Sequence, residues 1–143
     1  MEKKDNQVLD NNTSRKDQIN PSSKTIMAVD DLDVMLGSLK TIFTEAGYDF
    51  IGKKSGQEAL KYLDSNEKKP DLFLLDINMP HMEGYELYEK IIKKGITTPV
   101  IFLSGNASDK FVRKAAKIGA DDFIVKPFDN EVMMNKIKKC LQN

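Results

Sequence analysis

The sequence contains one cysteine, one histidine and no net charge, and each of these scarcities excludes a class of protein. Cys140 alone cannot form an internal disulfide or a multi-cysteine metal site. His81 has neither a cysteine nor a second histidine to accompany it as a metal ligand, so we interpret it as a loop side chain. Lysine plus arginine equals aspartate plus glutamate at 22 each. This balance gives no field that favours nucleic acid or an anionic membrane.

Long hydrophobic runs are also missing. No apolar stretch is long enough to span a bilayer, and residues 1–5 are followed by no hydrophobic segment of the signal-peptide kind. We therefore expect a cytoplasmic protein. The 143 residues and 40% hydrophobic content fit a single domain with one core.

The first 24 residues are poor in apolar side chains. Only Met1, Val8, Leu9 and Ile19 are of appreciable size. So few apolar groups cannot offset the entropy cost of ordering the chain. We predict a flexible polar tail over residues 1–24 and one domain over residues 25–143.

From residue 25 onward, short apolar runs alternate with segments of helical periodicity. The predicted strands are residues 25–29, 48–51, 72–75, 100–103 and 123–125, and a helix is expected after each. Ser55 and Glu58 form a capping box for the second helix, and glycines at positions 47, 95 and 119 end three others. Asp121 and Asp122 are expected in a solvated turn. The alternation predicts an α/β fold with a doubly wound, five-stranded parallel sheet.

Charged or hydroxyl side chains come where four of these strands end. They are Asp30 and Asp31, Asp76, Ser104 and Lys126. Right-handed crossovers place the carboxyl ends of all parallel strands at one edge of the sheet, where ligands of such sheets bind. The side chains are therefore expected to converge although they are far apart in the sequence.

A cluster of three carboxylates and one lysine has a defined chemistry. The carboxylates repel one another unless a cation lies among them, and Mg²⁺ suits such a site because it prefers oxygen ligands and keeps positions open for phosphate oxygens. An aspartate can accept a phosphoryl group covalently, while lysine and serine hold phosphoryl oxygens. This chemistry needs positioning and charge neutralisation more than a strong base.

In family order, these residues resemble the receiver domains of two-component response regulators, in their single-domain, CheY-like form. The resemblance rests on residues 30–31, 76–80, 104–105 and 119–128, and it covers about residues 24–141. It implies a flavodoxin-like (βα)5 receiver fold and a cis peptide between Lys126 and Pro127. It also implies a phosphoprotein of phosphorelay signal transduction.

The resemblance assigns a role to each residue of the cluster. Asp76 is implied as the phosphoacceptor and a metal ligand, Asp31 as a direct Mg²⁺ ligand, and Asp30 as a ligand that usually acts through water. The backbone carbonyl of Asn78 would complete the protein's share of the metal shell. Lys126 would hold a phosphoryl oxygen.

The resemblance also implies a conformational switch. Ser104 would turn toward the phosphoryl group and Phe123 would swing inward, which alters the surface of the fourth helix, fifth strand and fifth helix where a downstream protein binds. Ser104 replaces a frequent threonine but keeps the hydroxyl, whereas Phe123 lacks the hydroxyl of a tyrosine. Asn78 and Asn106 match positions that tune the lifetime of the phosphorylated form. The implied phosphoryl donor is a histidine kinase or a histidine phosphotransfer protein, with neither nucleic acid nor membrane as a partner.

Plainer interpretations remain open for each residue taken singly. Aspartate and serine are common turn residues, paired acids cap helices, lysine is common at surfaces, and an aromatic strand residue packs in a core or at an edge. What distinguishes them here is that they occur together in one order.

Three other functions compete with a phosphorylated receiver. A Mg²⁺-dependent aspartyl-phosphate phosphatase of the haloacid-dehalogenase kind would carry a second acid where Asn78 stands. A nucleotide or flavin binder would need a glycine-rich loop in place of Asp30 and Asp31. A phosphorylation-independent pseudo-receiver that only docks partners is disfavoured by the intact Asp31, Asp76 and Lys126. We expect a receiver without an attached output domain, and no enzyme activity beyond its own phosphorylation and dephosphorylation.

Overall fold

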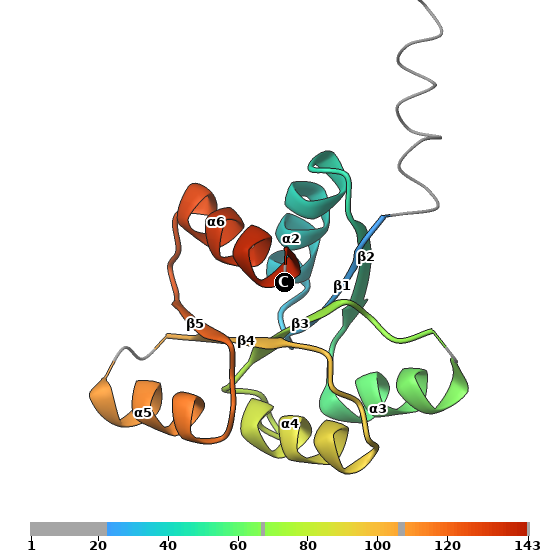
Figure 1. Ribbon diagram of the computed structural model, residues 1–143, viewed down its shortest axis with the longest axis vertical. Coiled ribbons are helices and arrows are strands. Elements are labelled where there is room, and N and C mark those ends of the chain that lie inside the picture. The colour runs from blue at the N-terminus through green and yellow to red at the C-terminus, as the bar shows by residue number, and fades with distance from the viewer. Residues whose placement is uncertain (1–22, 67, 106–107, 143) are drawn as a thin grey trace, which may run out of the picture.

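The computed structural model describes residues 23–66, 68–105 and 108–142. In this part of the chain, strands and helices alternate strictly (Figure 1). The strands are β1 (Thr25–Val29), β2 (Asp49–Lys53), β3 (Leu72–Asp76), β4 (Val100–Ser104) and β5 (Asp122–Val125). The helices are α2 (Asp33–Glu45), α3 (Gly56–Ser65), α4 (Gly84–Lys93), α5 (Asp109–Lys117) and α6 (Asn130–Leu141). Most of the predicted tail, residues 1–22, and Asn106 lie outside the described residues.

All five strands are parallel and follow the order β2-β1-β3-β4-β5. Helices α2 and α6 cover one face of the sheet, and α3, α4 and α5 cover the other (Figure 1). The predicted doubly wound, five-stranded parallel sheet is confirmed. This strand order is the flavodoxin-like one, in which β3 lies at the centre.

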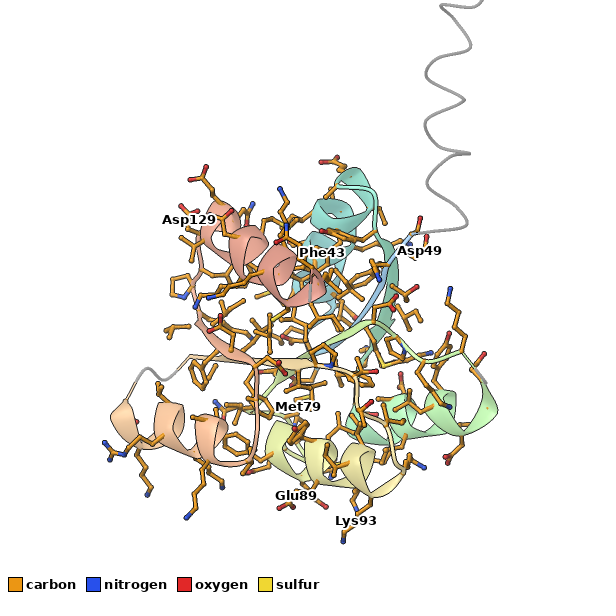
Figure 2. The ribbon with its side chains drawn as sticks, in the orientation of Figure 1. Phe43, Asp49, Met79, Glu89, Lys93 and Asp129 are labelled. Carbon is orange, nitrogen blue, oxygen red and sulfur yellow. The ribbon has the colours of Figure 1, made fainter. Side chains whose placement is uncertain are left out.

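The two faces of the sheet bury separate apolar cores. Along β1, Ile26 and Ala28 face the core that contains Phe43 of α2, while Met27 and Val29 face the core that contains Met79 (Figure 2). Strands β1, β3 and β4 are buried throughout, because helices cover both of their faces. Each large side chain removed from water in this way contributes about 1.5–3 kcal/mol, so both layers hold the central strands in place.

Several helix ends follow the predicted boundary chemistry. Ser55 Oγ accepts a hydrogen bond from the Glu58 N–H at 3.1 Å, as in a capping box. The Glu58 carboxylate accepts from the N–H of Lys54 at 3.3 Å, one residue before the usual partner. Gly47, Gly95 and Gly119 have φ of 94°, 83° and 100°, a left-handed conformation that suits glycine after a helix.

The predicted strand bounds differ slightly from those observed. The second strand was placed at residues 48–51 and instead spans Asp49–Lys53, because its register with β1 pairs Thr25 with Asp49 and Val29 with Lys53. Strands β3 and β4 extend one residue further than predicted, so Asp76 and Ser104 are their last residues. The extension fixes the backbone of both residues within the sheet.

The prediction of a solvated turn at Asp121 and Asp122 holds for Asp121, which is exposed in the bend before β5, but not for Asp122, which is half-buried in β5. Asp121 exchanges two hydrogen bonds with Val100 at the start of β4: its N–H donates to the Val100 carbonyl at 2.8 Å, and its carboxylate accepts from the Val100 N–H at 3.1 Å. Asp122 is the first residue of β5 and pairs with Lys136 of α6 at 2.9 Å. Both acids therefore join elements that are distant in the sequence.

Candidate functional site

The carboxyl edge of the sheet gathers the predicted site residues. Asp30 directly follows β1, Asp76 ends β3, Ser104 ends β4 and Lys126 directly follows β5. The register supports this arrangement, since Asp76 lies beside Leu103 and Ser104 beside Val125. The fold thus brings together side chains that are up to 96 residues apart.

The three carboxylates form one cluster. Asp30, Asp31 and Asp76 each offer an oxygen atom, and these atoms all lie within 4.8 Å of one another. Asp30 is fully buried and Asp76 is 4% exposed, whereas Asp31 is half-buried. Asp31 is therefore the most accessible of the three carboxylates.

Lys126 is the cation that contacts this cluster. Its Nζ lies 2.9 Å from Asp30 Oδ2 and 3.4 Å from Asp76 Oδ1. Desolvation lowers the pKa of Lys126, but the hydrogen bond to Asp30 and the charges of Asp76 and Asp30 outweigh it and leave the pKa raised. The lysine backbone is held as well: its N–H donates to the Ser104 carbonyl at 2.7 Å, and the Lys126–Pro127 peptide is cis, as predicted.

The Asp76 carboxyl has a raised pKa of about 6. Burial is the largest cause and the negative charge of Asp30 the second, while Lys126 and the Asn78 N–H lower the pKa in part. One ammonium does not compensate three clustered carboxylates. The site therefore favours an additional cation, and it could hold a metal ion.

The donor set fits a hard divalent cation. Carboxylate oxygens are the ligands that Mg²⁺ prefers, and a site with few protein ligands leaves positions for water and phosphate. Asn78 follows in the loop after β3, where its N–H donates to Asp76 Oδ1 at 3.4 Å and keeps the residue next to the carboxylate. The Asn78 carbonyl, the expected backbone ligand of the metal, belongs to the same loop.

Asp30 also stabilises the turn between β1 and α2. Its Oδ1 accepts a hydrogen bond from the N–H of Leu32 at 3.0 Å, at the start of α2. Asp30 thus both pairs with Lys126 and supports the first turn after β1. The prediction that Asp30 caps the first helix is not confirmed, because the N-cap residue of α2 is Leu32 and no side-chain cap hydrogen bond forms there.

The predicted switch residues lie on adjacent strands. Ser104 is fully buried at the end of β4, and Phe123 of β5 is half-buried and packs against the core beneath α3, α4 and α5. Phe123 is paired in register with Phe102. Strand β4 therefore carries both Ser104 and, two residues before it, Phe102, which is the partner of Phe123 on β5.

Sequence reasoning missed an aromatic cluster around Phe102. The rings of Tyr85 and Tyr88 meet Phe102 edge-on at centroid distances of 4.9 and 5.7 Å. Lys114 Nζ of α5 lies 4.5 Å from the centre of the Tyr85 ring. The helical spacing of α4 predicts only that Tyr88 lies on the inward-facing side of the helix. No local sequence pattern predicts that its ring contacts Phe102 of β4.

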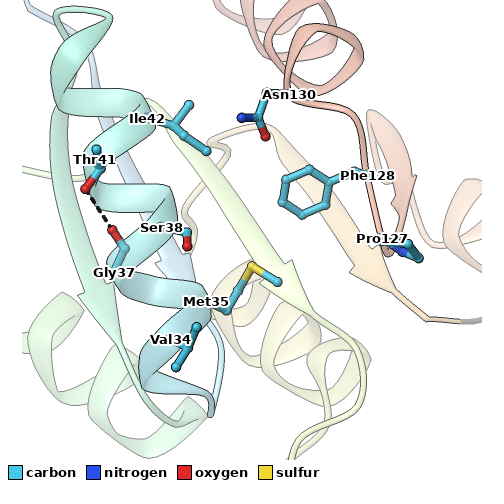
Figure 3. A pocket seen from close by; sticks show the side chains of 9 residues that line it. All are labelled: Val34, Met35, Gly37, Ser38, Thr41, Ile42, Pro127, Phe128 and Asn130. Carbon is cyan, nitrogen blue, oxygen red and sulfur yellow. Dashed lines mark hydrogen bonds between the residues drawn. The ribbon is translucent and has the colours of Figure 1, made fainter.

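Two other features lie outside the cluster. His81 is exposed in the loop between β3 and α4 with φ of 70°, in agreement with its interpretation as a loop residue. A groove of about 740 Å³ separates α2 from the segment that leads into α6, and Figure 3 shows Met35 and Phe128 at its walls. None of the three clustered carboxylates lines this groove.

The chain is similar to known proteins in sequence and in structure. Residues 26–138 match the model of the response regulator receiver domain. The chain is 38% identical over 118 residues to the chemotaxis protein CheY of Thermotoga maritima. The aligned segment covers 81% of this chain and 96% of that protein. It is 34% identical over 130 residues to the 3',5'-cyclic-nucleotide phosphodiesterase regA of Dictyostelium discoideum, but spans only 16% of that protein.

Among solved structures, the chain resembles the receiver domain of the Francisella response regulator 1452. The TM-score is 0.78 at 29% identity, and the match covers 84% of this chain and 98% of that one. Within the described residues, no helix combines the length and apolar character needed to cross a membrane.

Proposed function

The chain belongs to the receiver domain family of response regulators, and from this premise we propose that Asp76 accepts a phosphoryl group in a Mg²⁺-dependent reaction. One observation carries the proposal: three carboxylates converge within 4.8 Å beside a lysine that contacts two of them. A histidine kinase or a histidine phosphotransfer protein, the donors expected for this family, would supply the phosphoryl group.

The reaction forms one bond and breaks one. An Asp76 carboxylate oxygen attacks phosphorus, the bond between phosphorus and the donor nitrogen breaks, and the donor imidazole leaves with the electron pair. A bound Mg²⁺ would neutralise charge on the carboxylates and on the incoming phosphoryl oxygens. Asp76 must be ionised to attack, and because burial and the charge of Asp30 raise its pKa, an added cation would favour the ionised form.

Lys126 is placed to serve the acceptor. In the resting site its Nζ is shared between Asp30 and Asp76, at 2.9 and 3.4 Å. When Asp76 carries a phosphoryl group, the ammonium can hold one of its oxygens while it keeps the contact to buried Asp30. Asp30 and Asp31 would hold the metal, together with Asp76 and the Asn78 carbonyl.

The output follows from a change in packing. Ser104 would turn toward the phosphoryl group and free space beside Phe123, which would move inward and alter the face of α5, β5 and α6. The register supports this step, because Ser104 pairs with Val125, two residues after Phe123 on the adjacent strand. A downstream protein would bind this face, and the chain itself would catalyse only its own phosphorylation and dephosphorylation.

Intact-mass measurement after incubation with acetyl phosphate and Mg²⁺ tests the proposal. The wild-type chain is expected to gain one phosphoryl group, and Asp76→Asn none. Removal of Mg²⁺ with a chelator should abolish the gain in the wild type. A wild-type chain that stays unmodified, or a modification that persists in Asp76→Asn, would refute the assignment.

A further inference from the structure

A glycine at the start of α4 lies directly against the backbone of the proposed phosphoacceptor. A Cβ added to Gly84 would lie 2.5 Å from the carbonyl oxygen of Asp76 and 3.0 Å from Cα of Ile77. Contacts below 3.0 Å are essentially never made by real Cβ atoms, and here the opposing atoms are backbone, which cannot rotate away. Helix α4 therefore rests on the Asp76–Ile77 peptide with no room for a side chain.

Hydrogen bonds fix this contact on both sides. The Gly84 N–H donates to the Ile77 carbonyl at 2.9 Å, and the Ile77 N–H donates to the Leu103 carbonyl of β4 at 2.9 Å. Helix α4, the end of β3 and the end of β4 are thus joined through one residue, Ile77. Asp76 directly precedes this residue, while its partners Asp30 and Lys126 directly follow other strands.

The loop between Asp76 and Gly84 has a second fixed point. A Cβ at Gly56, the first residue of α3, would lie 2.4 Å from the sulfur of Met82, so this side chain fills the space above the glycine. Met82 is 7% exposed and belongs to the same loop as Asn78. Gly84 therefore lets α4 pack against the start of the loop at Asp76 and Ile77, and Gly56 leaves room for Met82 near the end of the loop.

We propose that Gly84 is a positioning residue for the phosphorylation site: by admitting α4 to the Asp76 carbonyl, it sets the distance of the Asp76 carboxylate and the Asn78 carbonyl from Asp30, Asp31 and Lys126. Gly56 supports the same loop through Met82. The inference rests on the proposed function. Mg²⁺ requires near-ideal octahedral geometry, so a shift of the Asp76 peptide by several tenths of an ångström would weaken metal binding before it unfolds the domain.

The test compares three single variants of the full chain. Gly84→Ala is expected to raise the Mg²⁺ dissociation constant measured by calorimetry roughly tenfold, and to slow phosphorylation by acetyl phosphate at saturating Mg²⁺ by a similar factor. Gly56→Ala should give a smaller change in the same direction, because the flexible Met82 side chain can move. Gly37→Ala is the matched control, since a Cβ there meets no atom within 4 Å.

Circular dichroism separates positioning from folding. If Gly84→Ala lowers stability but binds Mg²⁺ and accepts phosphate as the wild type does, the glycine has only a structural role and the inference is refuted. If Gly84→Ala does not fold, Gly56→Ala decides, and unchanged Mg²⁺ binding in that variant refutes the inference. A wild-type chain that binds Mg²⁺ but takes no phosphate would refute the proposed function alone, because the comparison of Mg²⁺ affinities stands without phosphorylation.

Discussion

The two edges of the sheet both use aspartates, but in different ways. At the amino edge, Asp71 and Asp121 each serve one neighbouring strand: Asp71 exchanges two hydrogen bonds with Thr25, and Asp121 exchanges two with Val100, at 2.8–3.1 Å. At the carboxyl edge, Asp30, Asp31 and Asp76 converge within 4.8 Å. Asp71 and Asp121 each accept a hydrogen bond from the N–H of a neighbouring strand, whereas Asp30 and Asp76 share one lysine.

The difference separates a structural carboxylate from a functional one. A carboxylate that accepts from a strand N–H satisfies a backbone donor that would otherwise be buried without a partner. Three carboxylates around one ammonium leave negative charge in a mostly buried place, which costs stability unless a cation binds. Among the described residues, such a cluster of three carboxylates occurs at the edge where the ligand is expected to bind.

The largest effect should come from neutralising the shared lysine. Lys126→Met keeps much of the side-chain volume but leaves the buried Asp30 carboxylate without its ammonium, and the phosphoryl oxygen without a partner. We expect phosphorylation by acetyl phosphate to slow about 100-fold, as when one charge-stabilising donor is removed from a reaction site. Timed intact-mass measurement gives the rate.

Lys94→Met is the matched control for this variant. Lys94 pairs with Asp64 between α4 and α3, away from the cluster, and both side chains are substantially exposed. Its loss should leave the phosphorylation rate unchanged. Equal rates in wild type and Lys126→Met would show that Lys126 is only a counter-ion of the resting site.

A smaller effect is expected on stability without metal. The pKa of Asp76 is raised from about 3.9 to about 6 in the folded chain, so the folded state holds the proton more tightly than the unfolded state. Stability from this group is therefore lost as pH rises from about 4 to about 6, and stays lost above. In chelator at pH 7.5, Asp76→Asn should be more stable than the wild type by about 3 kcal/mol.

Urea unfolding at several pH values checks this sign. The advantage of Asp76→Asn should shrink as pH falls and vanish below about pH 4, where the wild-type carboxyl becomes protonated in both states. Mg²⁺ should stabilise the wild type at pH 7.5 more than the variant. An Asp76→Asn chain that is less stable than the wild type at pH 7.5 in chelator would contradict the raised pKa.

The smallest effect should come from the amino edge. Asp121→Ala removes the acceptor for the Val100 N–H, and Asp71→Ala removes that for the Thr25 N–H. Each should cost about 1 kcal/mol of unfolding free energy, the usual loss of one hydrogen bond. Phosphorylation and Mg²⁺ affinity should be unchanged. A loss of Mg²⁺ affinity in either variant would contradict the distinction between the two edges of the sheet.

Much of the carboxyl edge could be predicted from the sequence because it depends on simple rules. Apolar runs that end on Asp30, Asp76 and Lys126 mark strand ends, and parallel connectivity brings strand ends together. The amino edge could not be predicted in the same way. Asp121 looks like any acid in a turn, and its bonds to Val100 depend on the register of β4 and β5, which no local pattern contains.

Contacts between the helices and the sheet could not be predicted from the sequence either. The approach of Gly84 to the Asp76 carbonyl depends on where α4 docks against the sheet, and a glycine at the first position of a helix gives no sign of it. The aromatic contacts of Tyr85 and Tyr88 with Phe102 also arise only when α4 packs on β4. Periodicity predicts which side chains turn inward, but it does not predict what they meet.

Direct localisation of the phosphoryl group in the unmutated chain tests the central claim most directly. After reaction with acetyl phosphate and Mg²⁺, borohydride reduces an acyl phosphate to an alcohol, and peptide sequencing by mass spectrometry locates the altered residue. We expect the reduced residue at Asp76 alone, and only when Mg²⁺ is present. Reduction at Asp30 or Asp31, or at an amino-edge acid such as Asp71 or Asp121, would contradict it.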